Sequence, residues 1–427
     1  MPDEPAALPK GWKLTPFNEL ATFETGRTPP RARPGYWAPP STEGTPWVTI
    51  GDMRPYGEVK QTAERVTPSA VRDVFRGRVS KKGTLIMSFK LTIGRVATLG
   101  LDACHNEAII SILPTNSVNQ KFLEYFLSQV DYADYQDRAV KGNTLNQEKI
   151  NRIAVAEPPK AEQDKIAAVL WKIQRAIELE EQLADTAREL KQSAMRQLFT
   201  HGLRNERQKD TEIGPLPETW STAPLGSFSR IGNGSTPLKA NTSYWANGSI
   251  PWLTSAKVYD VTIQEADQFV TQTAVDECHL PKVKPGSVLI AITGQGKTLG
   301  HAAVTAIETC VSQHIAFLSF NDTPVNPHFI RLFLESRYSE LRGVAQGGGS
   351  TKGALTCGFL KTFLVPKPEP DEQDQIASAL MTVEAKISVH ERKRAALQDL
   401  FQVLLHQLMT AQIRVDKLDI DTSEVAA

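Results

Sequence analysis

The sequence predicts an α+β protein with two tandem mixed α/β, strand-rich domains, which two long helices join as an antiparallel coiled coil. Three observations lead to this prediction. Several motifs occur twice in the 427 residues, each copy begins with a stretch rich in Gly, Pro, Thr and Trp, and each copy ends with a long stretch of helical spacing. A duplication of this kind also predicts a pseudo-twofold internal repeat.

The repeat is visible in motifs with a nearly constant offset. Leu-Pro-x-x-Trp at residues 8–12 recurs at 216–220, and Gly-x-Thr-Pro at 26–29 recurs at 234–237. The offset then drifts slightly, which small insertions in loops explain. The chain is therefore two copies of one unit.

The first part of each copy contains short apolar runs rich in Val, Ile, Leu and Phe between turn residues, which indicates strands. One helix is expected in each of these parts, at 119–130 and at 327–337. In the second copy, Asn326 can cap that helix and Pro327 suits its first turn.

The second part of each copy has apolar residues at a spacing of three and four, with no interior Gly or Pro. A long helix with one narrow apolar stripe needs a partner for that stripe, and we expect the other copy's helix, antiparallel to it. The alternative is that each helix docks on its own domain. The expected seam consists of Ile166, Leu170, Ile173, Ile177, Leu183, Leu190, Leu198, Ile376, Leu380, Val383, Ile387, Leu397, Phe401, Leu404 and Leu408.

These patterns divide the chain into five segments. We expect globular domains at 1–157 and 205–366, long helices at 158–204 and 367–413, and a flexible tail at 414–427.

Composition narrows the class of protein. No stretch reaches the ~18 apolar residues that span a bilayer, and the start, Met-Pro-Asp-Glu, does not resemble a signal peptide. The four cysteines lie far apart without metal-ligand spacing, so we expect reduced, mostly buried thiols and no metal site. A cytoplasmic protein is expected.

One motif suggests an enzyme. Residues 291–298, Ala-Ile-Thr-Gly-Gln-Gly-Lys-Thr, satisfy a loose phosphate-loop pattern. A phosphate loop must open a helix, but the residues after Thr298 are rich in glycine and strand formers, and the first copy has no such loop. The sequence also lacks the serine-hydrolase, zinc-protease and dinucleotide-binding motifs. We therefore expect a binding protein and not an enzyme.

The repeated motifs resemble the specificity subunit of type I restriction-modification systems. The resemblance rests on Leu-Pro-x-x-Trp, Gly-x-Thr-Pro, the Gly-[Thr/Ser]-x-Leu-Ile type of strand and, above all, the Pro-Pro-x-x-Glu-Gln-x-x-Ile-Ala start of a long helix. The second helix departs from this pattern, because Pro368-Glu369-Pro370 stands in place of a plain double proline.

The resemblance implies that each globular domain is a target-recognition domain for one half of a split double-stranded DNA site. The helical pair would set the gap between the halves. It implies two adenine methyltransferase subunits and restriction/translocase subunits as partners in a prokaryotic cytoplasm, and no membrane. No cofactor would bind this chain, and S-adenosylmethionine, ATP and magnesium would bind the partner subunits.

Cationic and polar loop residues are the candidates for DNA contacts, because lysine and arginine bind phosphates and polar side chains read bases. In the first domain they are Arg27, Thr28, Arg31, Arg33, Lys90, Thr92 and Arg95. In the second they are Ser235, Thr236, Lys239, Gln295, Lys297, Thr298, Ser350 and Lys352. The tryptophans that recur in register are expected in the core or between domain and helix: Trp12, Trp47, Trp220 and Trp252.

Two other functions stay open at this point. The chain could be a non-catalytic coiled-coil scaffold that binds protein partners. It could also be a nucleotide-dependent enzyme, in which case Lys297 would be required for turnover.

Overall fold

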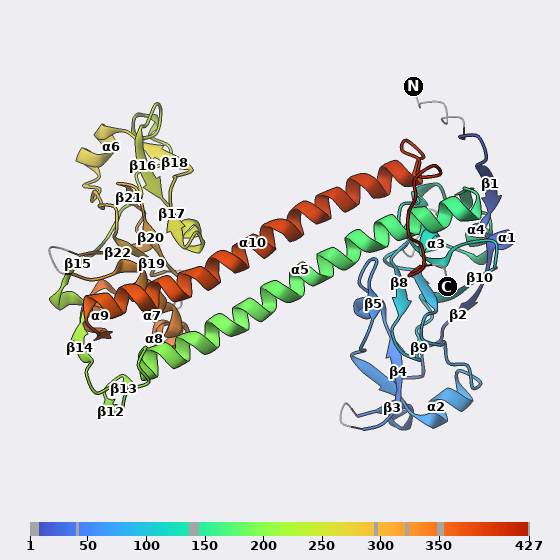
Figure 1. Ribbon diagram of the computed structural model, residues 1–427, viewed down its shortest axis with the longest axis horizontal. Coiled ribbons are helices and arrows are strands. Elements are labelled where there is room, and N and C mark those ends of the chain that lie inside the picture. The colour runs from blue at the N-terminus through green and yellow to red at the C-terminus, as the bar shows by residue number, and fades with distance from the viewer. Residues whose placement is uncertain are drawn as a thin grey trace. The chain divides into compact units, whose positions relative to one another are not determined.

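The computed structural model describes residues 8–39, 42–135, 145–293, 298–320, 324–347 and 354–425. The chain divides into two compact units (Figure 1). Unit 1 comprises Met1–Glu181 with Arg392–Ala427, and unit 2 comprises Gln182–Glu391. Each unit therefore contains one globular domain, the start of the helix that follows it, and the end of the other long helix.

The main sheet has the same strand order in both units. In unit 1 the order is β2-β10-β7-β8-β5, and in unit 2 it is β15-β22-β19-β20-β17. The unit 1 strands are β2 (Ala21–Thr25), β5 (Glu58–Val59), β7 (Leu85–Ser88), β8 (Val96–Leu99) and β10 (Ile109–Pro114). Those of unit 2 are β15 (Ser229–Asn233), β17 (Thr262–Ile263), β19 (Val288–Ala291), β20 (Ala302–Thr305) and β22 (Ile315–Phe320). All pairs are antiparallel except β5 with β8 and β17 with β20.

A second, smaller sheet completes each domain, in the order β3-β6-β4-β9 in unit 1 and β18-β16-β21 in unit 2. Its strands are β3 (Trp37–Ala38), β4 (Thr45–Val48), β6 (Glu64–Val66), β9 (Cys104–His105), β16 (Ile250–Leu253), β18 (Gln268–Val270) and β21 (Cys310–Val311). Strands β9 and β21 lead by a short turn into β10 and β22. The smaller sheet is thereby tied to the main one.

Two short strand pairs join the start of each domain to its end, and a hairpin precedes the second domain. They are β1 (Lys13–Pro16) with β11 (Ala154–Glu157), β14 (Ser221–Pro224) with β23 (Leu364–Lys367), and the hairpin of β12 (Gln208–Thr211) with β13 (Gly214–Pro217). The short helices are α1 (Phe17–Leu20), α2 (Pro68–Asp73), α4 (Gln147–Asn151), α6 (Gln272–Glu277), α8 (Tyr338–Gly347) and α9 (Cys357–Thr362).

The helix predicted inside each domain is present. Helix α3 spans Gln120–Leu127 with Asn119 as its cap, and α7 spans Pro327–Ser336 with Asn326 as its cap. Each cap oxygen accepts a backbone N–H from the first turn, at 3.0 Å from Phe122 and 3.1 Å from Phe329. These caps satisfy amides that would otherwise lack a partner.

The two long helices are α5 (Lys160–His201) and α10 (Pro370–Met409). They run antiparallel within each unit. In unit 1, Glu162 at the start of α5 binds Arg414 just past the end of α10, whereas Glu180 lies 3.8 Å from Lys393. In unit 2, Lys191 of α5 lies 2.7 Å from Glu384 of α10. The prediction of an antiparallel helix pair is confirmed.

The Glu-Gln-Asp motif at the start of each long helix fastens that helix to its domain. Glu162 and Glu372 accept the indole N–H of Trp12 and Trp220, at 3.2 and 3.0 Å. The Gln163 side chain accepts a hydrogen bond from the backbone N–H of the cap residue Asn119 at 2.8 Å. Asp164 accepts one from the Asn119 side-chain amide at 2.7 Å.

Unit 2 repeats the last two contacts with Gln373 and Asp374, which hold Asn326 at 3.0 and 2.7 Å. The recurring motifs of the sequence are thus the joint between domain and helix. Trp12, Trp47, Trp220 and Trp252 are all buried, as predicted.

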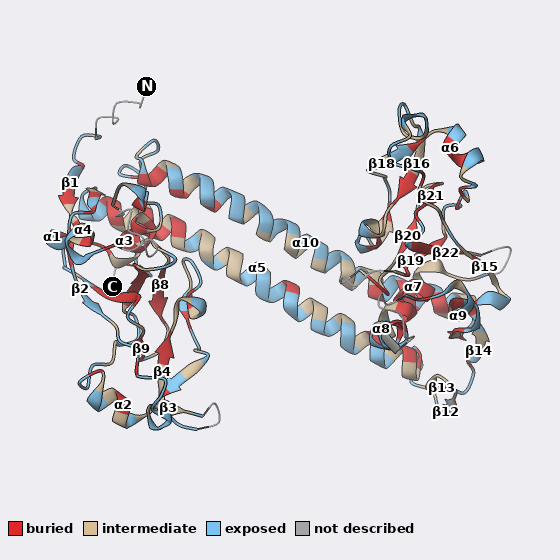
Figure 2. Ribbon diagram, turned by 180° about the vertical axis from the view of Figure 1, so that it is seen from behind, coloured by how far each residue is buried: buried red, intermediate tan, exposed pale blue. Residues whose placement is uncertain are grey.

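Most buried positions of the two long helices lie where the helices enter the domain cores (Figure 2). Ile166, Leu170, Phe401 and Leu408 belong to the core of unit 1, and Ile376 and Leu380 to that of unit 2. The other seam residues that are half-buried are Ile173, Ile177, Leu198, Val383, Ile387, Leu397 and Leu404.

Two seam assignments were wrong. Leu183 and Leu190 are 40% and 57% exposed, whereas Ala184 and Met195 are buried. Within each unit an ion pair also links the two helices, Glu180–Lys393 in unit 1 and Arg188–Glu391 in unit 2.

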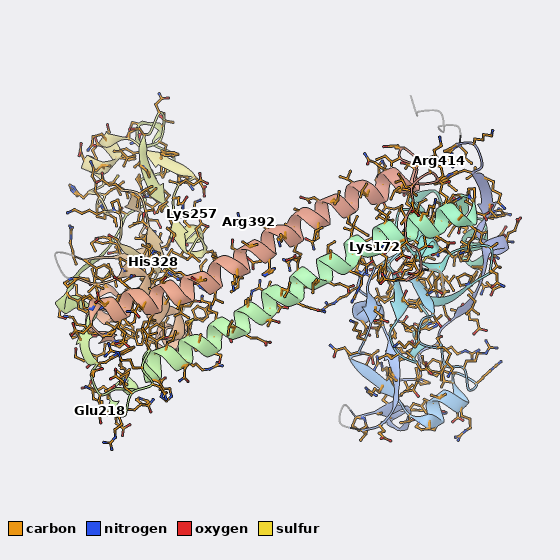
Figure 3. All side chains as sticks on the ribbon, in the orientation of Figure 1. Lys172, Glu218, Lys257, His328, Arg392 and Arg414 are labelled. Carbon is orange, nitrogen blue, oxygen red and sulfur yellow. The ribbon has the colours of Figure 1, made fainter. Side chains whose placement is uncertain are left out.

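The C-terminal residues, expected to form a flexible tail, pack against unit 1. Val415 and Val425 are buried in its core, and the Val425 carbonyl accepts the Asn119 side-chain amide at 2.9 Å. Arg414, labelled in Figure 3, donates to the buried Glu162 at 2.6 and 3.0 Å. Lys172, also labelled there, donates to the Asp421 carbonyl at 3.3 Å. The tail is fixed because the buried carboxylate of Glu162 requires a cation, which Arg414 supplies.

Candidate nucleic-acid interface

In unit 1, several of the predicted DNA-binding residues gather around the turn at 106–108 between β9 and β10. On one side, Arg27 donates its backbone N–H to the His105 carbonyl at 2.8 Å, and the Thr28 hydroxyl donates to the Glu107 carboxylate. On the other side, the residue before Lys90, Phe89, donates its backbone N–H to the Ala108 carbonyl at 2.9 Å. The first loop of candidates and the β7–β8 loop therefore flank one turn.

The Gly-x-Thr-Pro motif makes this close approach possible. A Cβ atom on Gly26 would lie 2.2 Å from the carbonyl oxygens of His105 and Asn106, and one on Gly234 would lie 1.6 Å from that of Val311. Only glycine fits at such a crossing. The next residue is then held by a tryptophan, since Trp47 donates to the Arg27 carbonyl and Trp252 to the Ser235 carbonyl, both at 3.1 Å.

Each motif is followed by a cation that lies over a tryptophan ring. The Arg31 guanidinium is 3.9 Å from the centre of the Trp37 ring, and the Lys239 ammonium is 3.7 Å from that of Trp245. Glu64 pairs with Arg31 in two hydrogen bonds, which raises the pKa of Arg31 and lowers that of Glu64. Both cations are exposed but fixed in direction, which suits a contact with a phosphate.

The remaining candidates of unit 1 differ in how exposed they are and in whether they already donate hydrogen bonds within the domain. Arg33 is exposed and donates to the Tyr36 hydroxyl at 3.1 Å. Lys90 is half-buried beside the Phe89 ring, and Thr92 is exposed. Arg95 donates to the Ile50 carbonyl at 2.9 Å, so part of its guanidinium already holds a neighbouring turn.

Unit 2 repeats this arrangement at the turn 312–314 between β21 and β22. Ile292 donates its backbone N–H to the His314 carbonyl at 2.9 Å, and Thr293 forms an isolated bridge with Ala354. Ser235, Thr236 and Thr298 are half-buried. The candidates Gln295, Lys297, Ser350 and Lys352 lie outside the described residues.

The structure around residues 291–298 does not support a phosphate loop. The apolar strand before it, β19, is followed after Thr298 by a turn and then by strand β20. A nucleotide-binding loop needs a helix at this place, whose amino-terminal amides hold the phosphates.

Sequence reasoning missed three exposed residues of this surface, Leu91, Glu107 and Gln313. Leu91 lies in the β7–β8 loop, is 80% exposed and has a φ of 65°. The loop is organised from inside by buried Ser88, whose hydroxyl donates to the Thr92 carbonyl and accepts the Arg95 N–H at 3.1 Å. The sequence offered one signal for Leu91, its place between the candidates Lys90 and Thr92.

Replacing Leu91 by glycine should leave the free energy of unfolding unchanged or raise it by up to about 1 kcal/mol, because glycine adopts a positive φ without strain. Leu14, 62% exposed in strand β1, is the matched control. There Leu14→Gly should lower that free energy by about 1 kcal/mol. Urea denaturation followed by tryptophan fluorescence measures both, and equal losses would show that Leu91 supports the fold.

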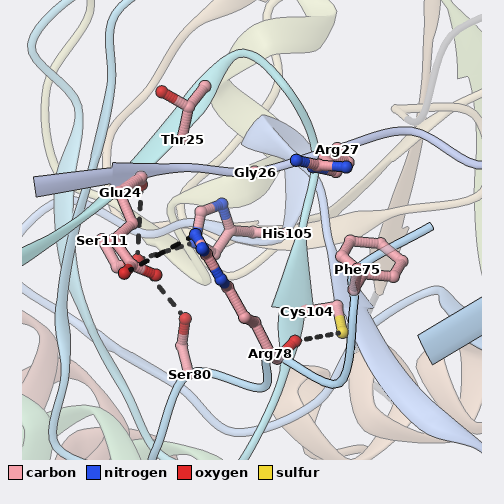
Figure 4. A pocket seen from close by; sticks show the side chains of 10 residues that line it. All are labelled: Glu24, Thr25, Gly26, Arg27, Phe75, Arg78, Ser80, Cys104, His105 and Ser111. Atoms are coloured by element: carbon pink, nitrogen blue, oxygen red, sulfur yellow. Dashed lines mark hydrogen bonds and ion pairs between the residues drawn. The ribbon is translucent and has the colours of Figure 1, made fainter. Parts of the chain in front are cut away.

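A small cavity lies beneath the unit 1 crossing, lined by residues that include Arg27, Arg78, Cys104 and His105 (Figure 4). Its volume is about 30 Å³, which suits a water molecule and no larger ligand. Burial lowers the pKa of His105 to about 4 and raises that of Cys104 to about 12. The His105 ring lies 3.0 Å from the Ser111 hydroxyl.

The buried His105 should make unit 1 sensitive to acid. Its pKa in the folded state is below the unfolded value near 6.5, so its contribution is complete above pH 6.5 and is lost as the pH falls toward 4. At pH 4.5 the loss should be about 2 kcal/mol. The control is His105→Val, which copies Val311 at the equivalent place in unit 2. Urea denaturation gives the free energy of unfolding of both proteins, and the value for the unsubstituted chain minus that for His105→Val should fall by this amount between pH 7.5 and 4.5. A difference that is independent of pH would contradict the assignment.

Comparisons with known proteins agree with this arrangement. The family model for the type I restriction modification DNA specificity domain matches residues 9–188 and 217–399. The chain belongs to this family. The two matches are the two copies of the repeat, and each extends into one of the long helices.

Specificity subunits are also among its relatives. The chain is 23% identical over 319 residues to the putative type I restriction enzyme MjaX specificity subunit of Methanocaldococcus jannaschii. This match covers 73% of this chain and 72% of that protein. It is 24% identical over 163 residues to the EcoR124I/EcoR124II specificity subunit of Escherichia coli, with 38% and 39% covered. The type I S subunit structure from M. genitalium shares the fold, with a TM-score of 0.63, 13% identity, and 94% and 96% of the two chains covered.

The described part of this specificity subunit contains neither a membrane-spanning helix nor a cluster of metal-binding side chains. None of its described helices has the length and apolar character needed to cross a membrane. No group of three or more His, Cys, Asp or Glu residues within 8–39, 42–135, 145–293, 298–320, 324–347 and 354–425 could hold a metal ion.

Proposed function

We propose that each unit of this specificity subunit reads one half of a bipartite DNA site and that the long helices set the gap between the halves. One observation carries the proposal. The same backbone frame occurs twice, fixed by the same glycine crossing and the same tryptophan, but it presents Arg31 and Glu107 in unit 1 and Lys239 and Gln313 in unit 2. A duplicated frame with different polar groups suits the reading of two different sequences.

The helices also offer a surface for two adenine methyltransferase subunits. Large apolar side chains that the fold leaves exposed lie on both helices: Leu179, Leu183, Leu190, Leu400 and Val403. Exposed apolar side chains contribute to a protein interface when they lie together on one surface. Binding of the methyltransferase subunits there would explain why α5 has leucines that the helix pair does not bury.

In this assignment the subunit itself catalyses no reaction. S-adenosylmethionine, ATP and magnesium would bind the methyltransferase and restriction subunits, in the cytoplasm of a prokaryote. The strand that follows Thr298 supports this part of the proposal over a nucleotide-dependent enzyme.

The experiment is a footprint of the full chain in complex with its methyltransferase on DNA. We expect two short protected segments with an unprotected gap between them, and methylated adenines in both segments. Uniform, sequence-independent protection would instead favour a scaffold that binds protein partners.

A further inference from the structure

The turns at 106–108 and 312–314 share one backbone frame. Asn106 and Ser312 donate their N–H groups to the carbonyls of Val48 and Leu253, at 3.0 and 2.9 Å. Their side-chain oxygens accept the N–H two residues later, at 3.0 Å from Ala108 and 3.4 Å from His314. The middle residue of each turn is therefore held in the same direction by its neighbours.

That middle residue differs between the units: it is Glu107 in unit 1 and Gln313 in unit 2. Both are exposed. Glu107 forms no ion pair with any described residue, and its one described partner is the Thr28 hydroxyl, which contacts Oε2. Oε1 is thus left for a ligand, and Thr28 fixes the direction of the carboxylate.

A lone carboxylate is unexpected on this surface. Arg27, Thr28 and Lys90 flank the same turn, and a negative charge near DNA phosphates weakens binding. The carboxylate would lower affinity unless it accepts hydrogen bonds from a base. Cytosine offers its N4 amino group in the major groove to such an acceptor, whereas glutamine pairs with the N6 and N7 atoms of adenine.

We infer that Glu107 and Gln313 are equivalent base-reading residues, with Glu107 selecting a cytosine in the first half-site and Gln313 an adenine in the second. Thr28 is a positioning residue for Glu107. This inference rests on the proposed function, since it requires that the two turns face DNA.

The test uses the complete complex with the methyltransferase and a library of sites in which both half-sites are randomised. Glu107→Gln should change the preference at one position of the first half-site from cytosine to adenine, by roughly tenfold. The gap, the second half-site and the other positions should stay the same. Gln313→Glu should give the reciprocal change in the second half-site.

Glu19→Gln is the matched control, because Glu19 is an exposed glutamate of unit 1 on α1, away from the turn. It should leave the selected sites unchanged. Unaltered half-sites in both turn variants, or a loss spread evenly over all bases, would overturn the inference while leaving the bipartite site in place. Failure of the unsubstituted complex to select any bipartite site would instead overturn the proposed function.

Discussion

Four helix-forming residues inserted into both α5 and α10 should lengthen the gap between the two half-sites by one or two base pairs. The insertions belong after Glu181 and after Glu391, where the two units meet in the sequence. Four residues add about 6 Å and a net rotation of about 40°. One base-pair step is about 3.4 Å with a rotation of about 35°, so the rotation fits one step and the length lies between one and two. The Glu180–Lys393 and Arg188–Glu391 pairs stay intact on either side.

Site selection from a randomised library, with the methyltransferase present, measures the gap and the half-sites together. A seven-residue insertion is a useful contrast, because it adds about 10 Å but leaves a net rotation of only about 20°. Three base pairs would rotate the second half-site by about 100°, so this variant should bind any site weakly. Four residues inserted after Glu43, in the loop between β3 and β4, should leave the gap unchanged. Altered half-sites with an unaltered gap would reject the proposal that the helices measure distance.

The parts of the fold that could be predicted from the sequence are those whose contacts are made by repeated motifs. Glu162 and Trp12 recur as Glu372 and Trp220 because each pair forms the same buried joint. The position of Leu190 could not be predicted, because periodicity alone does not show which stripe of a helix faces a partner when Lys191 supplies the contact instead. The fixed tail was missed for a similar reason, since Arg414 pairs with Glu162, which lies 252 residues earlier in the sequence.

The candidate site was predicted only in part. Arg31 and Lys239 could be found because they follow a recurring motif, and the structure places both over tryptophan rings. Glu107 could not be found in this way. A search for cations and small polar groups excludes a carboxylate, and its importance follows from the cationic loops that the fold brings to either side of it.

Removal of the buried arginine Arg331 should destabilise unit 2 strongly. Arg331 lies on α7 with its side chain 2% exposed, and it donates to Glu384 of α10 at 2.6 Å. Lys191 of α5 also lies 2.7 Å from Glu384, but it pairs with Glu335 as well, so without Arg331 one ammonium would face two carboxylates. We expect Arg331→Met to lower the free energy of unfolding by about 3 kcal/mol, because a buried carboxylate is left with an incomplete partner set. Urea denaturation measures the loss.

The exposed pair Arg152–Glu148, 2.6 Å apart with side chains 74% and 68% exposed, is the control. Arg152→Met should cost less than about 0.5 kcal/mol, since solvent screens such a pair. The double variant Arg331→Met with Glu384→Met should recover most of the stability. It removes both charges together, and Arg331 Nε has no hydrogen-bond partner among the described residues. A double variant as unstable as the single one would show that packing, and not charge, holds this site.

The same pair of residues can decide which helix end enters which domain. At the position of Arg331, unit 1 has Glu124, which is fully buried and bonded to Thr98 and Lys121. At the position of Glu384, α5 has Gln174, which accepts the Tyr125 hydroxyl at 2.9 Å. If the start of α10 docked on unit 1, Glu384 would add a second buried carboxylate near Glu124, at a high cost in free energy. Charge therefore separates two helix starts that share the same motif, and this is why Arg331→Met should matter more than its ion pairs with Glu335 and Glu384 suggest.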